Sequence, residues 1–229
     1  MSVSIRRPSP SDASAIAAIA EKTFGEPFDR DRIGGLLKSG RDYSLVALDA
    51  RGILAFADNF MTVSETGTQR LELDLLAVEP KAQGLGIGRR LIAESLLIAR
   101  ELDVPLLRAL VRSENLVMRG LCASCGFAAS AQSYDLYVAS PGPGSNGSLE
   151  IKGTHLVPVE TLAYSGIWIE GSLSRAGISW ALSVAATQQL QRVGALVAQS
   201  DRAPIQLLAD KGFQLLGTYN WWALKPKNG

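Results

Sequence analysis

Apolar positions change their period several times along the chain, and each change predicts an element. Residues 44–49 and 53–61 are mostly apolar and flank Ala50-Arg51-Gly52, which predicts a β-hairpin. Before them, apolar residues at helical spacing predict one helix that starts after Asp12 and a shorter one from Asp29 or Asp31 to Leu37. The pattern therefore mixes helices and strands.

The middle of the chain predicts a strand, a helix and a second strand. Residues 71–78 are mostly β-compatible, and Pro80 ends the run because proline has no N–H for a sheet ladder. Apolar positions from Leu91 to Leu102 recur at helical spacing, and residues 106–112 again favour a strand. A right-handed crossover would make the two strands parallel. The fold class is therefore α/β (α+β).

The segment that joins the first strand to this helix has the composition of an anion site. In Gln83-Gly84-Leu85-Gly86-Ile87-Gly88 every second residue is glycine, so several backbone N–H groups can turn toward one point. The helix start adds free N–H groups and a partial positive charge. Arg89 and Arg90 are disfavoured in a first helical turn unless an anion lies there. The segment predicts a phosphate-binding loop, whereas a plain glycine-rich turn is the structural alternative.

Composition limits the function classes. The 229 residues carry 23 Lys and Arg against 22 Asp and Glu, so no overall charge attracts nucleic acid or an anionic membrane. No apolar run has the length of about 20 residues that a membrane helix needs, and the first residues lack the apolar stretch of a secretory signal. We expect a cytoplasmic protein without nucleic-acid or membrane partners.

The two cysteines form one C-x-x-C pair, Cys122 and Cys125. Redox motifs of this spacing lie at helix N-termini, where the dipole lowers the thiol pKa, but these cysteines precede Gly126 at a predicted helix end. A zinc site would need about four ligands, and the single histidine, His155, is far away in sequence. We expect neither redox catalysis nor a bound metal.

Two motifs resemble the GNAT superfamily of N-acetyltransferases. Val78-x-Pro80-x-x-Gln83-Gly84-x-Gly86-Ile87-Gly88-x-x-Leu91 is similar to the family's acetyl-CoA loop. Asn115 followed by Leu121-Cys-Ala-Ser-Cys-Gly-Phe127 is similar to its Asn and Leu-Tyr-x-x-x-Gly-Phe elements. The resemblance covers residues 3 to about 138. It implies a mixed central sheet with flanking helices, acetyl-CoA as cosubstrate and transfer of an acetyl group to an amine.

The resemblance also implies a set of coenzyme-binding residues. Backbone amides from Leu76 to Val78 would pair with the pantetheine arm and polarise the thioester carbonyl, and the glycine loop would hold the diphosphate. Asn115 would bond the pantetheine arm or nearby backbone, although a helix cap explains it equally well. The expected residues are Leu76, Ala77, Val78, Gln83, Gly84, Leu85, Gly86, Ile87, Gly88, Arg89 and Asn115.

Three residues are candidates for proton transfer. Glu72 and Asp74 interrupt an apolar strand, and side-chain alternation predicts that both share a face with Leu76 and Val78. Either acid would accept the amine proton through water, or both simply lie on an exposed face. Cys122 aligns with the family's tyrosine acid, and its thiol would protonate the departing thiolate, or else it is a small buried hydrophobe.

The C-terminal part repeats the pattern of the first. Ala195-Leu-Val-x-x-x-Asp201 and Leu207-x-Ala-x-x-Gly-Phe213 match residues that lie 86 positions earlier. Residues 139–148 are rich in Pro, Gly and Ser, which predicts a boundary between domains 1–140 and 149–229. The second copy is truncated and has lost the glycine ladder, so we expect it to bind no CoA. We also expect adjacent Trp221 and Trp222 to face opposite sides of a strand.

These observations lead to two function hypotheses. The first is an N-acetyltransferase that acetylates a small-molecule amine or a peptide N-terminus by direct attack, as a monomer or homodimer. In the GNAT family the two N-terminal helices overhang the acceptor, which makes Phe24, Glu26, Phe28 and Asp29 candidates for acceptor contacts. The second is an acyl-CoA-binding module with little turnover, because the family tyrosine is missing and the second copy has decayed.

Overall fold

The computed structural model describes residues 2–142 and 151–226. Ten strands form one mixed sheet in the order β1-β2-β3-β4-β5-β10-β6-β9-β8-β7. The strands are β1 (Ser4–Arg6), β2 (Leu45–Asp49), β3 (Gly52–Val63), β4 (Gln69–Val78), β5 (Leu107–Arg112), β6 (Ala128–Ala139), β7 (Thr154–Glu160), β8 (Ser165–Gly171), β9 (Arg192–Ala198) and β10 (Gln214–Leu224). The helices are α1 (Ala13–Phe24), α2 (Arg30–Ser39), α3 (Ile87–Glu101), α4 (Leu116–Ser124), α5 (Arg175–Thr187) and α6 (Ala203–Asp210), with 3-10 turns at Pro10–Asp12 and Pro80–Ala82.

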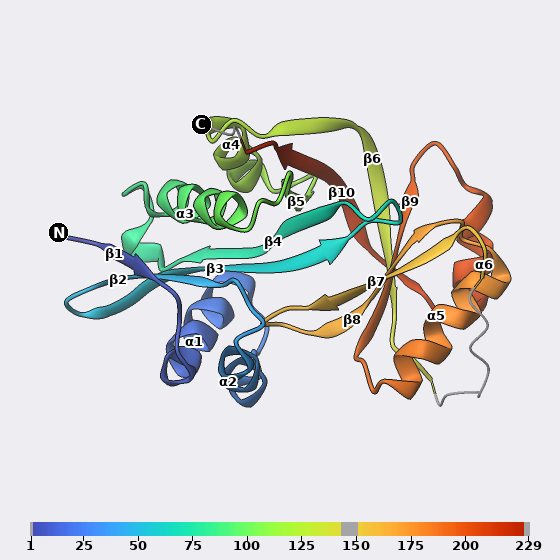
Figure 1. Cartoon of the computed structure of the whole chain (residues 1–229), viewed down its shortest axis with the longest axis horizontal. Coiled ribbons are helices and arrows are strands. Elements are labelled where there is room, and N and C mark those ends of the chain that lie inside the picture. Colours follow the sequence, from blue (N-terminus) through green and yellow to red (C-terminus); the bar gives the residue numbers. More distant parts are fainter. Residues whose placement is uncertain (1, 143–150, 227–229) are drawn as a thin grey trace.

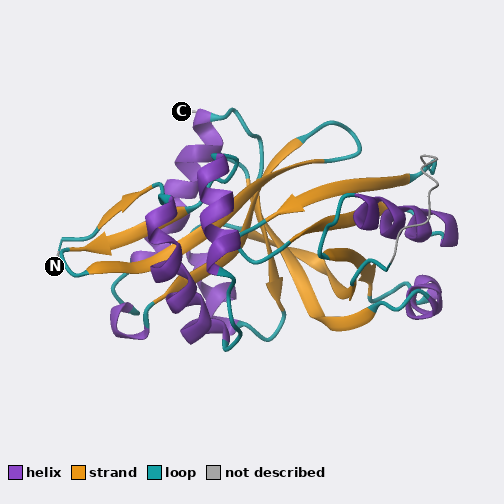
Figure 2. Cartoon of the chain, turned by 90° about the horizontal axis from the view of Figure 1, so that it is seen from below, coloured by secondary structure: helices purple, strands orange, loops and turns teal. Residues whose placement is uncertain are grey.

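Helices cover both faces of the first half of the sheet (Figure 1). On one face α3 packs on β2 to β5 around Leu73, Leu91 and Leu107, and α4 extends the same core. On the other face α1 and α2 pack on Phe56 and Ala77. These cores match the apolar stripes of the sequence. In Figure 2 the twisted sheet runs through the molecule, with helices gathered in two groups along it.

A β-bulge in β4 changes which side chains share a face. The β3–β4 register passes from Asn59↔Leu73 to Asp58↔Leu75, so Asp74 is an extra residue in β4. Leu71 and Leu73 belong to the α3 core before the bulge, whereas Leu76 and Val78 belong to it after the bulge. The prediction that Glu72 shares a face with Leu76 and Val78 is therefore wrong, because the added residue reverses the alternation.

Strands β4 and β5 start side by side and then separate. They pair in parallel, as predicted, from Leu71↔Leu107 to Leu73↔Ala109. β4 continues to Val78 and stays paired with β3 on its other side. Residues 74–78 therefore present an edge with free backbone groups toward β5. Asp74 lies where this gap begins.

The two halves of the chain exchange strands. β10 comes from the C-terminal repeat, yet it pairs with β5 and β6 of the first half. β6 in turn pairs with β9 of the repeat. Since β5 corresponds to β9 and β6 to β10 in the repeat, each copy lends its last strand to the other. This exchange could not be predicted from the sequence, because equivalent strands offer equivalent backbone hydrogen bonds.

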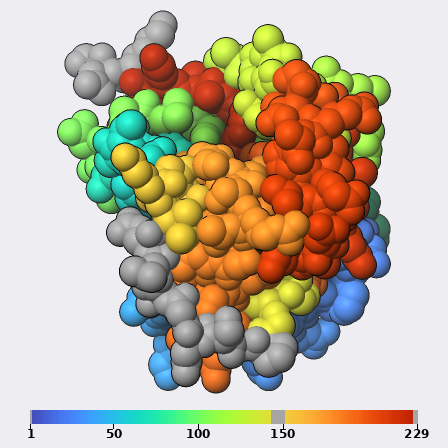
Figure 3. Space-filling model, turned by 90° about the vertical axis from the view of Figure 1, so that its right-hand side faces the viewer, coloured from blue at the N-terminus to red at the C-terminus, as the bar shows by residue number. Residues whose placement is uncertain are grey.

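The C-terminal copy also folds back onto the first half. Hairpin β7–β8 lies on the face that α1 and α2 cover, with Leu162 in the α1–α2 core. His155 Nε2 lies 3.0 Å from the Val63 carbonyl, and Phe60 contacts Trp168 edge to face with ring centroids 5.6 Å apart. Figure 3 shows this side, where the orange and red repeat fills the surface beside cyan residues of the first half.

The strand exchange joins the two predicted domains, 1–140 and 149–229, in one sheet. β6 extends to Ala139, and residues 143–148 of the predicted linker lie outside the described residues, as do residues 149 and 150. Without β10, the edges of β5 and β6 would lose their partner, and the core that contains Trp222 would open. We therefore propose that the two copies are units of one fold rather than independently stable domains.

Separating the copies tests this proposal. We expect a chain of residues 1–142 to lose cooperative thermal unfolding, because it exposes two strand edges and lacks Trp222. Co-expression with residues 151–229 should restore one unfolding transition, measured by circular dichroism. A fragment 1–142 that unfolds cooperatively by itself, at the temperature of the whole chain, would contradict the proposal.

Candidate active site

The glycine loop has the geometry of an anion cradle. Gly84 and Gly86 have φ angles of 78° and 75°, which favour glycine. Gly86 is the N-cap of α3 and has no side chain that could cap the helix. Along this helix start, Arg90 is the first residue whose backbone N–H makes a hydrogen bond, and it donates to the Gly86 carbonyl. The N–H groups from Gly84 to Arg89 have no partner among the described residues. Six free amides at a helix start fit a diphosphate.

Side chains around the loop have different roles. The Gln83 amide donates to the Val78 carbonyl over 3.1 Å and so fixes the strand end. Arg90 donates to the Val3 carbonyl over 2.8 Å, whereas Arg89 is exposed and has no partner within the described part of the chain. Arg89 is therefore the side chain here that is free to meet an anion.

Asn115 and Cys122 belong to α4. Asn115 caps the helix, because its side-chain oxygen accepts from the Met118 N–H over 2.9 Å. Cys122 has no exposed surface and lies in the α3–α4 core. Burial raises the pKa of its thiol to about 12, so the thiol stays protonated. Its catalytic role stays a prediction, and its position is that of a small buried hydrophobe.

The two strand acids have unlike surroundings. Glu72 is fully buried, and its carboxylate accepts from Arg108 Nε over 2.8 Å and from the Thr62 hydroxyl. Arg70 lies 3.5 Å away, and Glu170 of the C-terminal copy pairs with both arginines. Glu72 is therefore held in a buried network of charged hydrogen bonds with the two arginines.

Asp74, half-buried at the bulge, has no such cation. Burial and the charge of Glu72 raise its pKa to about 7, and the Thr161 side chain, which bonds it, lowers the pKa in part. Asp58, on the neighbouring strand, is fully buried and accepts from the Leu162 N–H over 2.7 Å and from Ser44 over 3.1 Å. Burial and the charge of Asp74 raise the pKa of Asp58 to about 8. Near pH 7 the Asp74 carboxyl can therefore both accept and release a proton, whereas the Asp58 carboxyl is mainly protonated.

Several residues of this site were missed from the sequence. Burial and the charge of Asp74 raise the pKa of Tyr164, which lies in the β7–β8 hairpin of the second copy. Tyr219, on the exchanged strand β10, also has its pKa raised by burial, and Asp74 contributes. The Tyr219 oxygen accepts from Arg112 Nε over 2.9 Å. Only the strand exchange and the folded-back hairpin bring these side chains to Asp74.

The residues of the N-terminal helices that were predicted to contact the acceptor bond with their own neighbours rather than with the acid cluster. Asp29 caps α2 by accepting from the amides of Asp31 and Arg32. Phe24 and Phe28 contact each other with ring centroids 5.9 Å apart. Their contact with an acceptor stays a prediction.

The described helices include none with the length and hydropathy of a membrane crossing.

Sequence comparison identifies the family. The sequence model of the acetyltransferase (GNAT) family matches residues 14–127, which include β4, the cradle and α4. The chain belongs to the GNAT family of acetyltransferases. It is therefore an acyltransferase, and its first half is the GNAT unit. A search of curated proteins gives no match.

Solved structures share the fold of both copies. A tandem GNAT protein from the clavulanic acid biosynthesis pathway is 13% identical, with a TM-score of 0.61 and full coverage of both chains. A Pyrococcus horikoshii protein described as an acetyltransferase is 14% identical, with a TM-score of 0.63 over 98% of this chain and 90% of that one. yncA from Salmonella typhimurium, solved with its cofactor acetyl-CoA, is 22% identical with a TM-score of 0.53, over 58% of this chain and 84% of that one. The architecture is a GNAT unit followed by a truncated GNAT-like α/β unit.

The second unit lacks a comparable cradle. Ser174 caps α5 by accepting from the Gly177 N–H, so a side chain already occupies that helix start. A Cβ on Gly177 would clash with the Thr154 hydroxyl, because the two segments pack closely at this turn. These contacts support the prediction that the C-terminal unit binds no CoA.

Proposed function

We propose that the chain transfers an acetyl group from acetyl-CoA to a primary amine of a small metabolite or a peptide N-terminus, by direct attack of the amine. The observation that supports this most is the position of Asp74. Asp74 lies where β4 leaves β5, at the start of the free strand edge, and its pKa is raised to about 7. A base with that pKa suits proton transfer near neutral pH.

The coenzyme would lie along the gap between β4 and β5. The six free amides from Gly84 to Arg89 would hold its diphosphate, and Arg89 would add a positive charge. Amides of the strand edge from Leu76 to Val78 would pair with the pantetheine arm and stabilise negative charge on the carbonyl oxygen. When bound, acetyl-CoA supplies the activated thioester. Fixing it beside the amine provides much of the effective concentration.

Three proton movements complete the transfer. Asp74 would accept a proton from the ammonium and pass it to water, so that the neutral nitrogen can form a bond to the carbonyl carbon while the carbon–sulfur bond breaks. The nitrogen, which is positively charged after the attack, then loses a second proton to Asp74, and this proton balances the one that the thiolate takes up. The departing thiolate then needs a proton. Cys122, the candidate from sequence, is fully buried. The Tyr219 hydroxyl accepts from Arg112 Nε, and burial raises its pKa, with a contribution from the charge of Asp74, so it keeps its own proton. We propose Tyr219 for this step.

Thiol release tests the proposal. Purified protein with acetyl-CoA and a panel of primary amines should release free CoA in an amine-dependent way, whereas acetyl-CoA alone should not react. In the same assay Tyr219→Phe should lower the rate at least about tenfold and Cys122→Ala should leave it near that of the wild type. Tight CoA binding without release for any amine would instead favour the acyl-CoA-binding module.

A further inference from the structure

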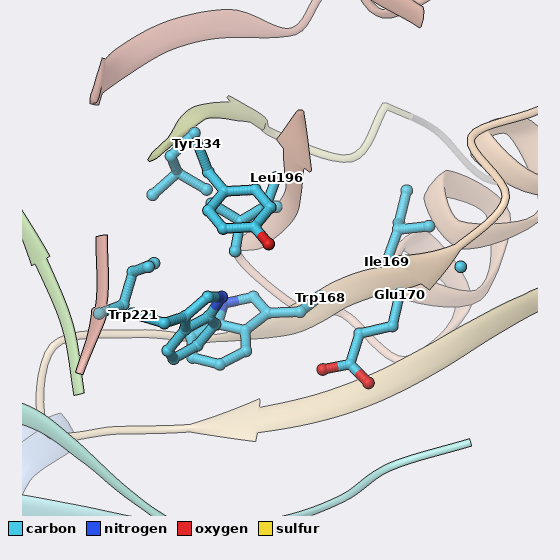
Figure 4. Close-up of a pocket in the computed structure, with 10 residues that line it drawn as sticks. Tyr134, Trp168, Ile169, Glu170, Leu196 and Trp221 are labelled. Atoms are coloured by element: carbon cyan, nitrogen blue, oxygen red, sulfur yellow. The ribbon is translucent and has the colours of Figure 1, made fainter. Parts of the chain in front are cut away.

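A pocket lies between the two units, on the face of the sheet opposite α3 to α6. Its volume is about 180 Å³. β5 and β6 of the GNAT unit form part of its wall, and β8, β9 and the exchanged strand β10 form the rest (Figure 4). Ten residues line it, and those that carry the argument are Tyr134, Trp168, Glu170, Leu196 and Trp221.

Aromatic rings make up much of this wall. Trp168 and Trp221 contact edge to face with ring centroids 6.0 Å apart, and Tyr134 lies across the pocket with its hydroxyl toward Trp168 (Figure 4). That hydroxyl has no hydrogen-bond partner among the described residues, so it is available to a ligand. Trp221 faces this pocket while Trp222 is in the GNAT core, as the predicted opposite orientation requires.

Charge is distributed unevenly around the pocket. Glu170 is the one charged residue among the ten that line it. The nearby cation Arg108 is covered by the Trp221 ring, whose centroid is 3.9 Å from the guanidinium carbon. The Glu170 carboxylate pairs with Arg70 over 2.9 Å and with Arg108 over 3.3 Å, so part of its charge is already balanced. The pocket thus shows a ligand mainly aromatic ring faces and aliphatic surface, with one ion-paired carboxylate at its edge. Such a surface favours an ammonium group on an apolar body and disfavours a carboxylate or phosphate.

The pocket is connected to the acid cluster by one side chain. Trp168 Nε1 donates to the Tyr164 hydroxyl over 3.2 Å, and Tyr164 is the residue whose pKa is raised in part by Asp74. A ligand against Trp168 therefore lies one residue away from Tyr164, a side chain on which the charge of Asp74 acts. The C-terminal unit provides seven of the ten lining residues, from Trp168 to Trp221.

We propose that this pocket is the acceptor-specificity site and that it takes primary amines with an aromatic or branched apolar body and no acidic group. The proposal rests on the proposed acetyltransferase function for its role, but the binding of such an amine does not depend on turnover. In this proposal the function of the degenerate repeat is to select the acceptor for the GNAT unit. Trp168, Trp221 and Glu170 are then specificity-determining residues.

Calorimetry without acetyl-CoA tests the pocket directly. The probes are 2-phenylethylamine and 3-phenylpropionate, which have similar shape and opposite charge. We expect the wild-type protein to bind the amine at least about tenfold more tightly than the acid. Leu196→Trp should fill the pocket and abolish amine binding, whereas Leu97→Trp, at an exposed position of α3, should not alter it. Both variants should keep the CoA affinity of the wild type, which shows that they fold.

Replacing the carboxylate tests the charge argument separately. Glu170→Gln keeps hydrogen-bond acceptors for Arg70 and Arg108 and should reduce the preference for the amine over the acid at least about tenfold. No binding of 2-phenylethylamine by the wild type, or equal binding by Leu196→Trp, would overturn the pocket proposal even if other amines are acetylated. Amine binding that Leu196→Trp abolishes, with no thiol release, would support the pocket and contradict the acetyltransferase proposal instead.

Discussion

Gly86→Asp is expected to lower the affinity for CoA by about 100-fold or more while the protein remains folded. Gly86 is the N-cap of α3, and Asp is a favoured N-cap residue that tolerates a positive φ better than most side chains. Its carboxylate would accept from the free amides of the helix start and occupy the place of the phosphate. It would also repel the diphosphate. A 100-fold loss corresponds to about 2.7 kcal/mol, which is a reasonable cost for blocking the amides of the site and adding a like charge beside the diphosphate.

The measurement is calorimetric titration with CoA, and the chain offers a matched control. Gly67 has a φ of 81° in the turn between β3 and β4, with open space where a Cβ would be. Gly67→Asp therefore introduces the same residue and similar backbone strain away from α3, and CoA affinity should not change. Wild-type affinity in Gly86→Asp would mean that the coenzyme binds elsewhere, and the proposed site would have to be abandoned.

Local patterns were sufficient to predict the elements and the cradle. The helical period ended at Gly25 and Gly40, and both adopt the left-handed conformation at a helix end. The glycine ladder predicted an anion loop because its chemistry is local: consecutive amides and one helix start need no distant partner. Trp221 and Trp222 took opposite faces for the same reason, since alternation along a regular strand is fixed by the backbone.

Features that depend on distant partners could not be predicted in the same way. The bulge at Asp74 is defined by the register against β3, and one added residue separated Glu72 from the face of Leu76. The repeat showed that β6 and β10 are equivalent, but equivalence cannot say which of them pairs with β5. Asp58, Glu170 and Tyr219 lay in ordinary strand sequences, and only folding brings them to the site.

Asp74→Asn, which replaces the proposed base, is expected to lower kcat/KM for the amine by roughly 10²- to 10⁴-fold with little change in CoA affinity. The amide has almost the same shape as the carboxyl group, so the β4 bulge should persist. It cannot accept the amine proton, however, which removes the proposed proton transfer. Asp31→Asn, at an exposed position in the first turn of α2, is the matched control and should leave the rate unchanged.

The pH profile separates a base from a structural residue. Asp74 can accept a proton only when ionised, and its pKa is raised to about 7, so wild-type kcat/KM should rise with pH below 7 and level off above it. Protonation of Asp74 at low pH inactivates the base, so kcat/KM falls as the pH is lowered through the pKa of Asp74. The charge of Asp74 also raises the pKa of the neighbouring Asp58, so the Asp74→Asn variant is what assigns the limb to Asp74. Asp74→Asn should remove the limb as well as the rate. A slow variant that keeps an unchanged limb near pH 7 would mean that another group is the base, and Glu72 would then be tested next by the same profile.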